Sequence, residues 1–378
     1  MNWLTQRFEL SRGGSGHDIR AMEGLRGFAV FLVFLVHYVT LVAPWVPASS
    51  ALRGFSGALH AMGNTGVDLF FVLSGYLIYG SLISRDQPFL RFMSRRVERI
   101  YPAFLVVFVI YVGLSFAFTA DRKIPAALGP GLAYLVENLL LLPGLFPIEP
   151  LITVAWSLSY EMLYYLAIPL VIVALGLRKR TPQWRVGLFA AAAVALALAG
   201  ALYGGHVRLI MFISGILLFE AVTQGRPRAP GSGVGLAALV AGLLCQLLPT
   251  SGSAGFTLKI SVLFFCFLLL TWTCLSRPTG WLPRAFSWRP VRWLGNMSYS
   301  YYLIHGLTLK AGFLVLGAML PASPRGPVFF WALMAAMFVL TLVPSAILFL
   351  TIERPFSLVP RRLQRRLPAS AVGSGQSG

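Results

Sequence analysis

The chain has 378 residues, of which 57% are hydrophobic and only 11% are charged, whereas a water-soluble domain usually carries about 25% charged residues. This composition excludes an ordinary water-soluble fold and indicates an all-α polytopic integral membrane protein. The formal net charge is +19, but the basic residues are scattered in short clusters between apolar stretches, so we expect lipid rather than nucleic acid as the large partner.

The first predicted transmembrane segment covers residues 27–46. It is longer than the apolar core of a signal peptide, which is about 7–15 residues, and it carries His37 at its centre, so we expect a retained helix. Nine more segments reach the roughly 17–25 apolar residues that a spanning helix needs. The ten predicted spans are 27–46, 64–83, 100–119, 154–177, 186–204, 206–223, 233–250, 257–276, 298–320 and 327–351.

A shorter apolar stretch, 132–146, follows the third predicted span. It contains Glu137 and is interrupted by Pro143, so we interpret it as a re-entrant or interfacial helix that does not cross the membrane. The basic residues support this interpretation, because cytoplasmic loops carry an excess of Lys and Arg. With both termini cytoplasmic, 24 of the 31 Lys and Arg residues fall on the cytoplasmic side, including those at 178–180.

The pattern shows no linker and no second domain. We expect a cytoplasmic N-terminal segment (1–26), a membrane domain (27–356) and a cytoplasmic tail (357–378) that is first basic and then rich in Ser and Gly. No spacing typical of metal ligands is present, so we expect no metal.

His37 is the first candidate for chemistry, because ionisable side chains inside the hydrocarbon region are costly and mark functional sites by default. It lies eleven residues after Arg26, an offset that returns to almost the same helix face ~16 Å further along. Arg26 is therefore expected at the cytoplasmic mouth of a face whose midpoint is His37. The alternative, a structural histidine bonded to a neighbouring helix, stays open.

Two acids lie in the outer halves of predicted spans, Asp68 in the second and Glu161 in the fourth. Either carboxylate could orient a histidine or bind hydroxyl groups of an acceptor. Each could instead be a buried partner in a salt bridge or hydrogen bond. Trp156 and Ser157 precede Glu161 closely and are included as candidates.

Three arginines, Arg95, Arg96 and Arg99, follow the second predicted span. Arg96 and Arg99 are three residues apart and share a helix face. The planar guanidinium suits phosphate, because it donates two parallel hydrogen bonds. Taken alone, however, the cluster is better explained by ordinary positive charges that anchor the topology.

His305, in the ninth predicted span, is a second intramembrane histidine, about two turns from the cytoplasmic face. A structural role is the favoured reading of this residue, and a functional role is the alternative.

Six segments stand in order between Glu23 and Phe356: EGLRGFAVFLVFLVH, GVDLFFVLSGYLI, RRVERIYP, WSLSYEMLYY, LGNMSYSYYLIH and IERPF. The first contains an Arg and a His separated by ten residues, and the third contains an RxxR element. This ordered set resembles the membrane-bound acyltransferase family 3, whose members O-acylate polysaccharides, lipids and small molecules.

The resemblance implies an enzyme of the bacterial cytoplasmic membrane that moves an acyl group, usually acetyl from acetyl-CoA, to a hydroxyl of a sugar. It implies that His37 is the catalytic histidine, that Arg26 is its motif partner, and that Arg96 and Arg99 belong to the acyl-CoA-binding side. His37 would act as general base, since a neutral imidazole takes up a proton near neutral pH. A transient acyl-histidine remains open.

The expected acceptor is a cell-surface polysaccharide or lipid-linked glycan that enters from outside past Asp68 and Glu161. A macrolide-like or other small-molecule metabolite is the alternative acceptor. A secondary transporter is the alternative function, because ionisable residues near the membrane midplane also mark substrate pathways.

Overall fold

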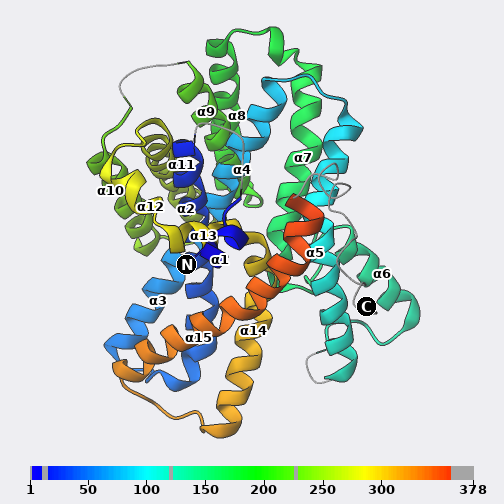
Figure 1. Cartoon of the computed structure of the whole chain (residues 1–378), viewed down its shortest axis with the longest axis vertical. Helices are drawn as coiled ribbons and strands as arrows, with labels where there is room; N and C mark the ends of the chain where they lie inside the picture. The colour runs from blue at the N-terminus through cyan, green and yellow to red at the C-terminus, as the bar shows by residue number, and fades with distance from the viewer. Residues whose placement is uncertain (1, 11–15, 119–121, 225–228, 359–378) are drawn as a thin grey trace, which may run out of the picture.

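The computed structural model describes residues 2–10, 16–118, 122–224 and 229–358 (Figure 1). From residue 359 onward the predicted tail, 357–378, lies outside this description. The helices are α1 (Asn2–Phe8), α2 (Gly16–Val42), α3 (Ala51–Gly63), α4 (Thr65–Ile83), α5 (Phe89–Ala117), α6 (Leu128–Leu139), α7 (Trp156–Ala174), α8 (Pro182–Tyr203), α9 (Ile210–Thr223), α10 (Ser232–Leu244), α11 (Gly252–Ser276), α12 (Trp281–Phe286), α13 (Arg289–Asn296), α14 (Ser298–Met319) and α15 (Pro327–Leu348), which continues as the π-helix η7 (Phe349–Leu358).

Eight helical stretches in the described residues are long and apolar enough to cross a membrane, which confirms a polytopic helical membrane protein. They are Arg20–Leu41, Ala51–Ile83, Phe89–Ala117, Thr153–Ala174, Pro182–Tyr203, Gly252–Ser276, Ser298–Met319 and Pro327–Leu358. The other two predicted spans correspond to α9, with 14 residues, and α10, with 13. A 3-10 turn extends each helix, η5 (Val207–Leu209) before α9 and η6 (Cys245–Leu247) after α10, and neither reaches the length of the eight stretches above.

Two helices differ from the predicted pattern. α3 was not expected, because Arg53, Ser56 and His60 interrupt its apolar residues. α6 begins before the predicted stretch 132–146 and ends at Leu139, ahead of Pro143. Its 12 residues extend ~18 Å, which is less than the ~30 Å hydrocarbon core. The length of α6 therefore agrees with a segment that does not cross the membrane on its own.

α2 is the central helix of the bundle and packs against α3, α4 and α11–α15. Buried apolar residues join it to α4, α5, α7, α9 and α11 in one cluster and to α14 and α15 in another. Close approach to α13 depends on Gly27 and Gly295, since a Cβ at either position would collide with the backbone of the facing helix. Small residues commonly allow such close packing between membrane helices. The packing fixes the position of α2 at Arg26, next to Gly27.

The segment that connects α6 to α7 is largely non-helical yet folds back into the protein. Leu141, Leu151 and Ile152 in this segment are each only 1% exposed. The backbone N–H of Leu151 donates to Oδ1 of Asn138 at 2.7 Å. In a membrane protein, irregular backbone is tolerated where protein surrounds it and satisfies its polar groups. This connection places the start of α7 inside the bundle.

Candidate functional site

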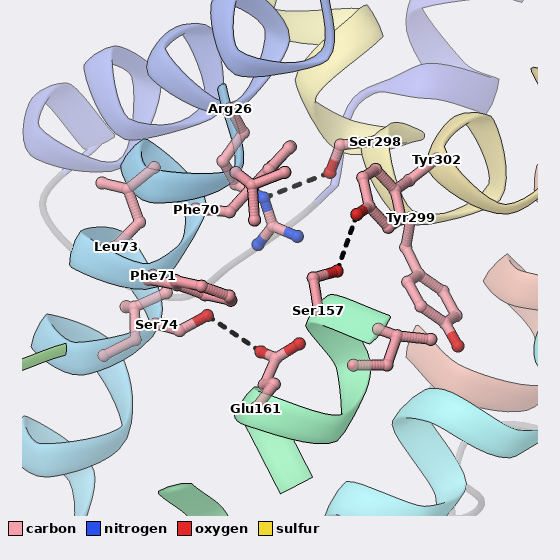
Figure 2. Close-up of a pocket in the computed structure, with 13 residues that line it drawn as sticks. Arg26, Phe70, Phe71, Leu73, Ser74, Ser157, Glu161, Ser298, Tyr299 and Tyr302 are labelled. Atoms are coloured by element: carbon pink, nitrogen blue, oxygen red, sulfur yellow. Dashed lines mark hydrogen bonds between the residues drawn. The ribbon is translucent and has the colours of Figure 1, made fainter. Parts of the chain in front are cut away.

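A pocket of about 70 Å³ lies where α2, α4, α7 and α14 meet (Figure 2). One water molecule needs roughly 10–15 Å³ on the same scale, so the pocket holds a few heavy atoms rather than a whole CoA or sugar chain. The lining residues are Arg26, Val67, Phe70, Phe71, Leu73, Ser74, Leu77, Ser157, Leu158, Glu161, Ser298, Tyr299 and Tyr302.

Arg26 contributes the positive charge of this pocket. Its Nε donates to Oγ of Ser298, the first residue of α14, at 3.2 Å. Figure 2 shows the guanidinium pointing into the space between Ser298 and Ser157. Arg26 therefore joins α2 to α14 and presents a fixed cation to whatever enters the pocket.

Glu161 lies in the same pocket, where two hydroxyl groups hold it. Its Oε1 accepts hydrogen bonds from Ser74 Oγ at 2.9 Å and from Tyr165 OH at 2.5 Å. The sequence predicted Arg26 at the cytoplasmic mouth and Glu161 in the outer half of its span, whereas in the structure both residues line one pocket. The connection before α7 is buried, and it holds the start of α7, and with it Glu161, against the other helices that line the pocket.

Asp68 and Trp156 form a different cluster, centred on Arg208. Oδ2 of Asp68, a fully buried residue, accepts from Arg208 Nη1 at 2.9 Å. The Arg208 guanidinium also lies over the rings of Trp156, at 5.7 Å, and Phe256, at 5.6 Å. The salt-bridge alternative for Asp68 is thus the one seen in the structure. Ser157, the neighbour of Trp156, instead lines the pocket.

The arginines of α5 lie just outside the pocket. Arg99 Nη1 bonds Oε1 of the buried Glu353 at 2.6 Å, and its guanidinium lies 5.6 Å from the ring of Tyr299. The Arg96 guanidinium lies 5.7 Å from the ring of Tyr165, the residue that donates to Glu161. Both arginines therefore contact a residue of the pocket or of its immediate surroundings.

The two intramembrane histidines are brought together. The rings of His37, on α2, and His305, on α14, lie edge to face with centroids 4.9 Å apart. Neither histidine lines the pocket, but Tyr302 does, and its ring lies 6.2 Å from that of His305. The histidine pair and the pocket are therefore neighbours on either side of Tyr302.

Several residues of the site were not among the sequence candidates. Ser298, Tyr299 and Tyr302 all lie in the LGNMSYSYYLIH segment, and Tyr302 precedes His305 by one helical turn. That spacing is a usable signal, since residues three apart share a helix face. The Tyr302 hydroxyl pairs with the Ser157 hydroxyl at 2.6 Å, which ties α14 to the start of α7.

Comparisons with known proteins identify the family of the chain. A family model described as an acyltransferase domain matches residues 19–350. Acyltransferase MdmB from Streptomyces mycarofaciens is 27% identical over 343 residues, which are 83% of this chain and 85% of that protein. Exopolysaccharide production protein ExoZ from Rhizobium meliloti is 27% identical over 337 residues, 84% of this chain and 96% of that protein.

A third relative, peptidoglycan O-acetyltransferase OatA from Listeria monocytogenes, is 26% identical over 322 residues. The match covers 76% of this chain but only 49% of the Listeria protein, so the chain spans about half the length of that relative. No solved structure matches. The family match covers most of the chain, and the relatives are named as acyltransferases or for polysaccharide production. The chain therefore belongs to the membrane-bound acyltransferase family 3 and is a multi-pass membrane acyltransferase.

Proposed function

We propose that this enzyme moves a short acyl group from cytoplasmic acyl-CoA to a sugar hydroxyl of a cell-surface polysaccharide or lipid-linked glycan. The proposed acyl group is acetyl. Its proposed location is the bacterial cytoplasmic membrane. The observation that carries the proposal is a small pocket, lined by Arg26 and Glu161, next to a pair of histidines inside a helical membrane bundle. Two relatives, named for exopolysaccharide production and peptidoglycan O-acetylation, support a glycan as acceptor.

Three arginines support an anionic donor. Arg26 lines the pocket, while Arg96 and Arg99 lie over aromatic rings at its edge. Guanidinium groups bind phosphate oxygens through paired, charge-assisted hydrogen bonds. The phosphates of CoA are therefore proposed to bind near these arginines. An acyl arm following α2 would extend ~16 Å from the level of Arg26 to that of His37.

The proposed reaction is direct transfer with His37 as general base. A neutral ring nitrogen of His37 takes the proton of the acceptor hydroxyl while its oxygen attacks the thioester carbonyl. The new C–O bond forms, the C–S bond breaks, and the proton on His37 passes to the departing CoA sulfur. Atoms and charges balance, and His37 returns to its neutral form. The alternative is a two-step transfer, in which the acyl group moves first to His37, as an acyl-histidine, and then to the acceptor hydroxyl.

The test is acyl transfer by the full-length protein, purified in detergent, from labelled acetyl-CoA to glycan acceptors. His37→Gln keeps hydrogen bonding and approximate size but cannot take up a proton, so transfer should fall by about 10²-fold or more. His206→Gln is the matched control, because His206 is exposed and bonds Tyr160 outside the pocket. Substantial transfer by well-folded His37→Gln protein would contradict the mechanism.

The acceptor class needs a separate experiment. Mass spectrometry of surface glycans and of extractable metabolites, with and without the gene, should show an acetyl-sized difference in the glycans. A difference confined to a small-molecule metabolite would replace the proposed acceptor.

A further inference from the structure

His305 is held in one tautomer by its own helix. Its Nδ1 lies 2.9 Å from the carbonyl oxygens of both Tyr301 and Tyr302. A carbonyl oxygen only accepts hydrogen bonds, so Nδ1 must carry the hydrogen. In the neutral ring the other nitrogen, Nε2, is then a bare acceptor.

This acceptor is buried and has no hydrogen-bond partner in the part of the chain that the structure describes. His305 is 0% exposed, so water does not reach it from the surface. Its ring is also fixed in place, because the Tyr301 ring stacks on it at 5.2 Å and the Tyr301 hydroxyl bonds Thr341 at 2.8 Å. A buried acceptor without a partner is uncommon, and it calls for an explanation.

His37 lies beside His305, and its ring is edge to face with the His305 ring at a centroid distance of 4.9 Å and an interplanar angle of 67°. At this separation a ring N–H of His37 can reach Nε2 through rotation about its terminal side-chain bond, which has a broad preference. His37 is only partly buried, so its remaining nitrogen can face the reactants.

We propose that His305 is a positioning residue for His37, with Nε2 accepting the N–H of the His37 ring. This contact would leave the other His37 nitrogen without a hydrogen, so that it can take the proton of the acceptor hydroxyl. The third residue of a catalytic triad orients its histidine in the same way. The inference rests on the proposed function, in which His37 is the general base. A neutral imidazole suits this role inside the bundle, since it needs no counter-charge, whereas a buried carboxylate does.

The proton balance leaves His305 unchanged. The proton of the acceptor hydroxyl goes to His37, which then carries two N–H groups. One of them remains bonded to Nε2 of His305, and the other delivers its proton to the departing CoA sulfur. His305 neither gains nor loses a proton during the cycle.

Two substitutions separate positioning from structure. His305→Gln places an amide oxygen near the site of Nε2 and keeps an acceptor for His37. His305→Asn is the matched control, because its shorter amide can donate to the Tyr301 and Tyr302 carbonyls but leaves the Nε2 site empty. We expect kcat to fall by about 10²-fold in His305→Asn, with KM for both substrates unchanged, and to fall much less in His305→Gln.

Equal activity of the two variants, or higher activity of His305→Asn, would overturn the proposal, since satisfying the carbonyls is all that a structural role requires. Wild-type protein and His37→Gln are assayed first. Absence of wild-type transfer, or transfer by His37→Gln, would be a failure of the proposed function instead.

A spectroscopic measurement covers the case in which the His305 variants do not fold. Wild-type protein and His37→Gln, both labelled with ¹⁵N-histidine, are compared by solid-state NMR. The unprotonated Nε2 signal of His305 should shift when His37 is replaced, because its hydrogen-bond donor changes. An unchanged signal would show that His37 does not donate to His305 and would overturn the proposal.

Discussion

Arg95, Arg96 and Arg99 of α5 differ in what surrounds each guanidinium. Arg95 is exposed. Arg99 is neutralised by the buried carboxylate of Glu353. Arg96 lies over two aromatic rings, and its Nε is buried without a hydrogen-bond partner among the described residues. Arg96 is therefore the residue of the three whose charge is best placed to bind a phosphate.

Replacing Arg96 by Ala should raise the KM for acyl-CoA by about tenfold or more, because a hydrogen bond to a charged group contributes about 1.5–3 kcal/mol. The KM for the acceptor should change little. Steady-state kinetics with each substrate varied in turn measures both quantities.

Arg95→Ala is the matched control, since it removes the same charge one position earlier on the same helix. It should leave the KM for acyl-CoA close to the wild-type value. Equal effects of the two substitutions would mean that these arginines act only through the overall charge of the cytoplasmic side, which is the topology-anchor alternative.

At the scale of single residues, the sequence predicted candidate site residues but not the residues that contact them. Arg26, His37 and Glu161 were identifiable, because a charged or ionisable side chain in an apolar segment is conspicuous. Their neighbours were not. His37 and His305 are 268 positions apart in the chain, and helix periodicity says nothing about which distant helix faces another.

At the scale of elements, Glu353 links η7 to two other helices of the bundle. Its Oε1 bonds Arg99 of α5 at 2.6 Å, and its Oε2 accepts from the backbone N–H and the hydroxyl of Ser300 in α14. Three elements far apart in the chain therefore meet at one buried carboxylate. The IERPF segment is thus a structural connection next to the pocket wall at Tyr299.

Glu353→Gln should lower the thermal unfolding temperature of the purified protein by several degrees. The substitution leaves Arg99 without its counter-charge, and breaking a buried ion pair costs about 3–5 kcal/mol. Asp86→Asn is the control, since its carboxylate is 87% exposed and bonds Arg178 at the surface. An exposed pair contributes about 0–1 kcal/mol, so this variant should melt like the wild type. Equal melting of both variants would refute the structural role of Glu353.

The contact between α4 and α9 depends on glycines that face each other. A Cβ at Gly75 would collide with the backbone of Phe212, and one at Gly215 with the backbone of Val72. α4 carries Phe70, Phe71 and Ser74 of the pocket, so this contact also sets the position of the pocket wall.

Gly75→Ala should therefore reduce both the thermal stability and the transfer activity, because α4 must move away from α9. Gly113→Ala is the matched control, since Gly113 lies within α5 with open space around the position of an added Cβ. Alanine in a helix is favoured over glycine by about 1 kcal/mol, so the control should be neutral or slightly stabilising. Wild-type stability of Gly75→Ala, measured in the same detergent, would contradict the packing described here.

At the scale of the whole molecule, the fold class and most helix positions followed from apolar length, because lipid imposes one simple requirement on every spanning segment. The position of α7 in the bundle could not be predicted from apolar length. It depends on how the buried connection 140–152 packs and hydrogen-bonds within the bundle. α3 was missed for a related reason. Its mixed surface packs against α2 and the 3-10 turn η6 (Cys245–Leu247) that follows α10, and such tertiary contacts have no signature in a hydropathy pattern.

Between α5 and α8 we expect the chain to cross the membrane once, through α7, because α6 is too short to cross on its own. Reporter fusions should read cytoplasmic after Arg180 and outside near Arg122, because positive charge favours the cytoplasmic side and α5 then crosses once. A fusion after Arg366, in the tail, should also read cytoplasmic. The reporters near Arg122 and Arg180 indicate opposite sides of the membrane only if the segment between them crosses it an odd number of times. An outside signal after Arg180 would mean that the α6 region and α7 together cross an even number of times, and the topology proposed here, including the cytoplasmic position of the arginines that follow α7, would be wrong.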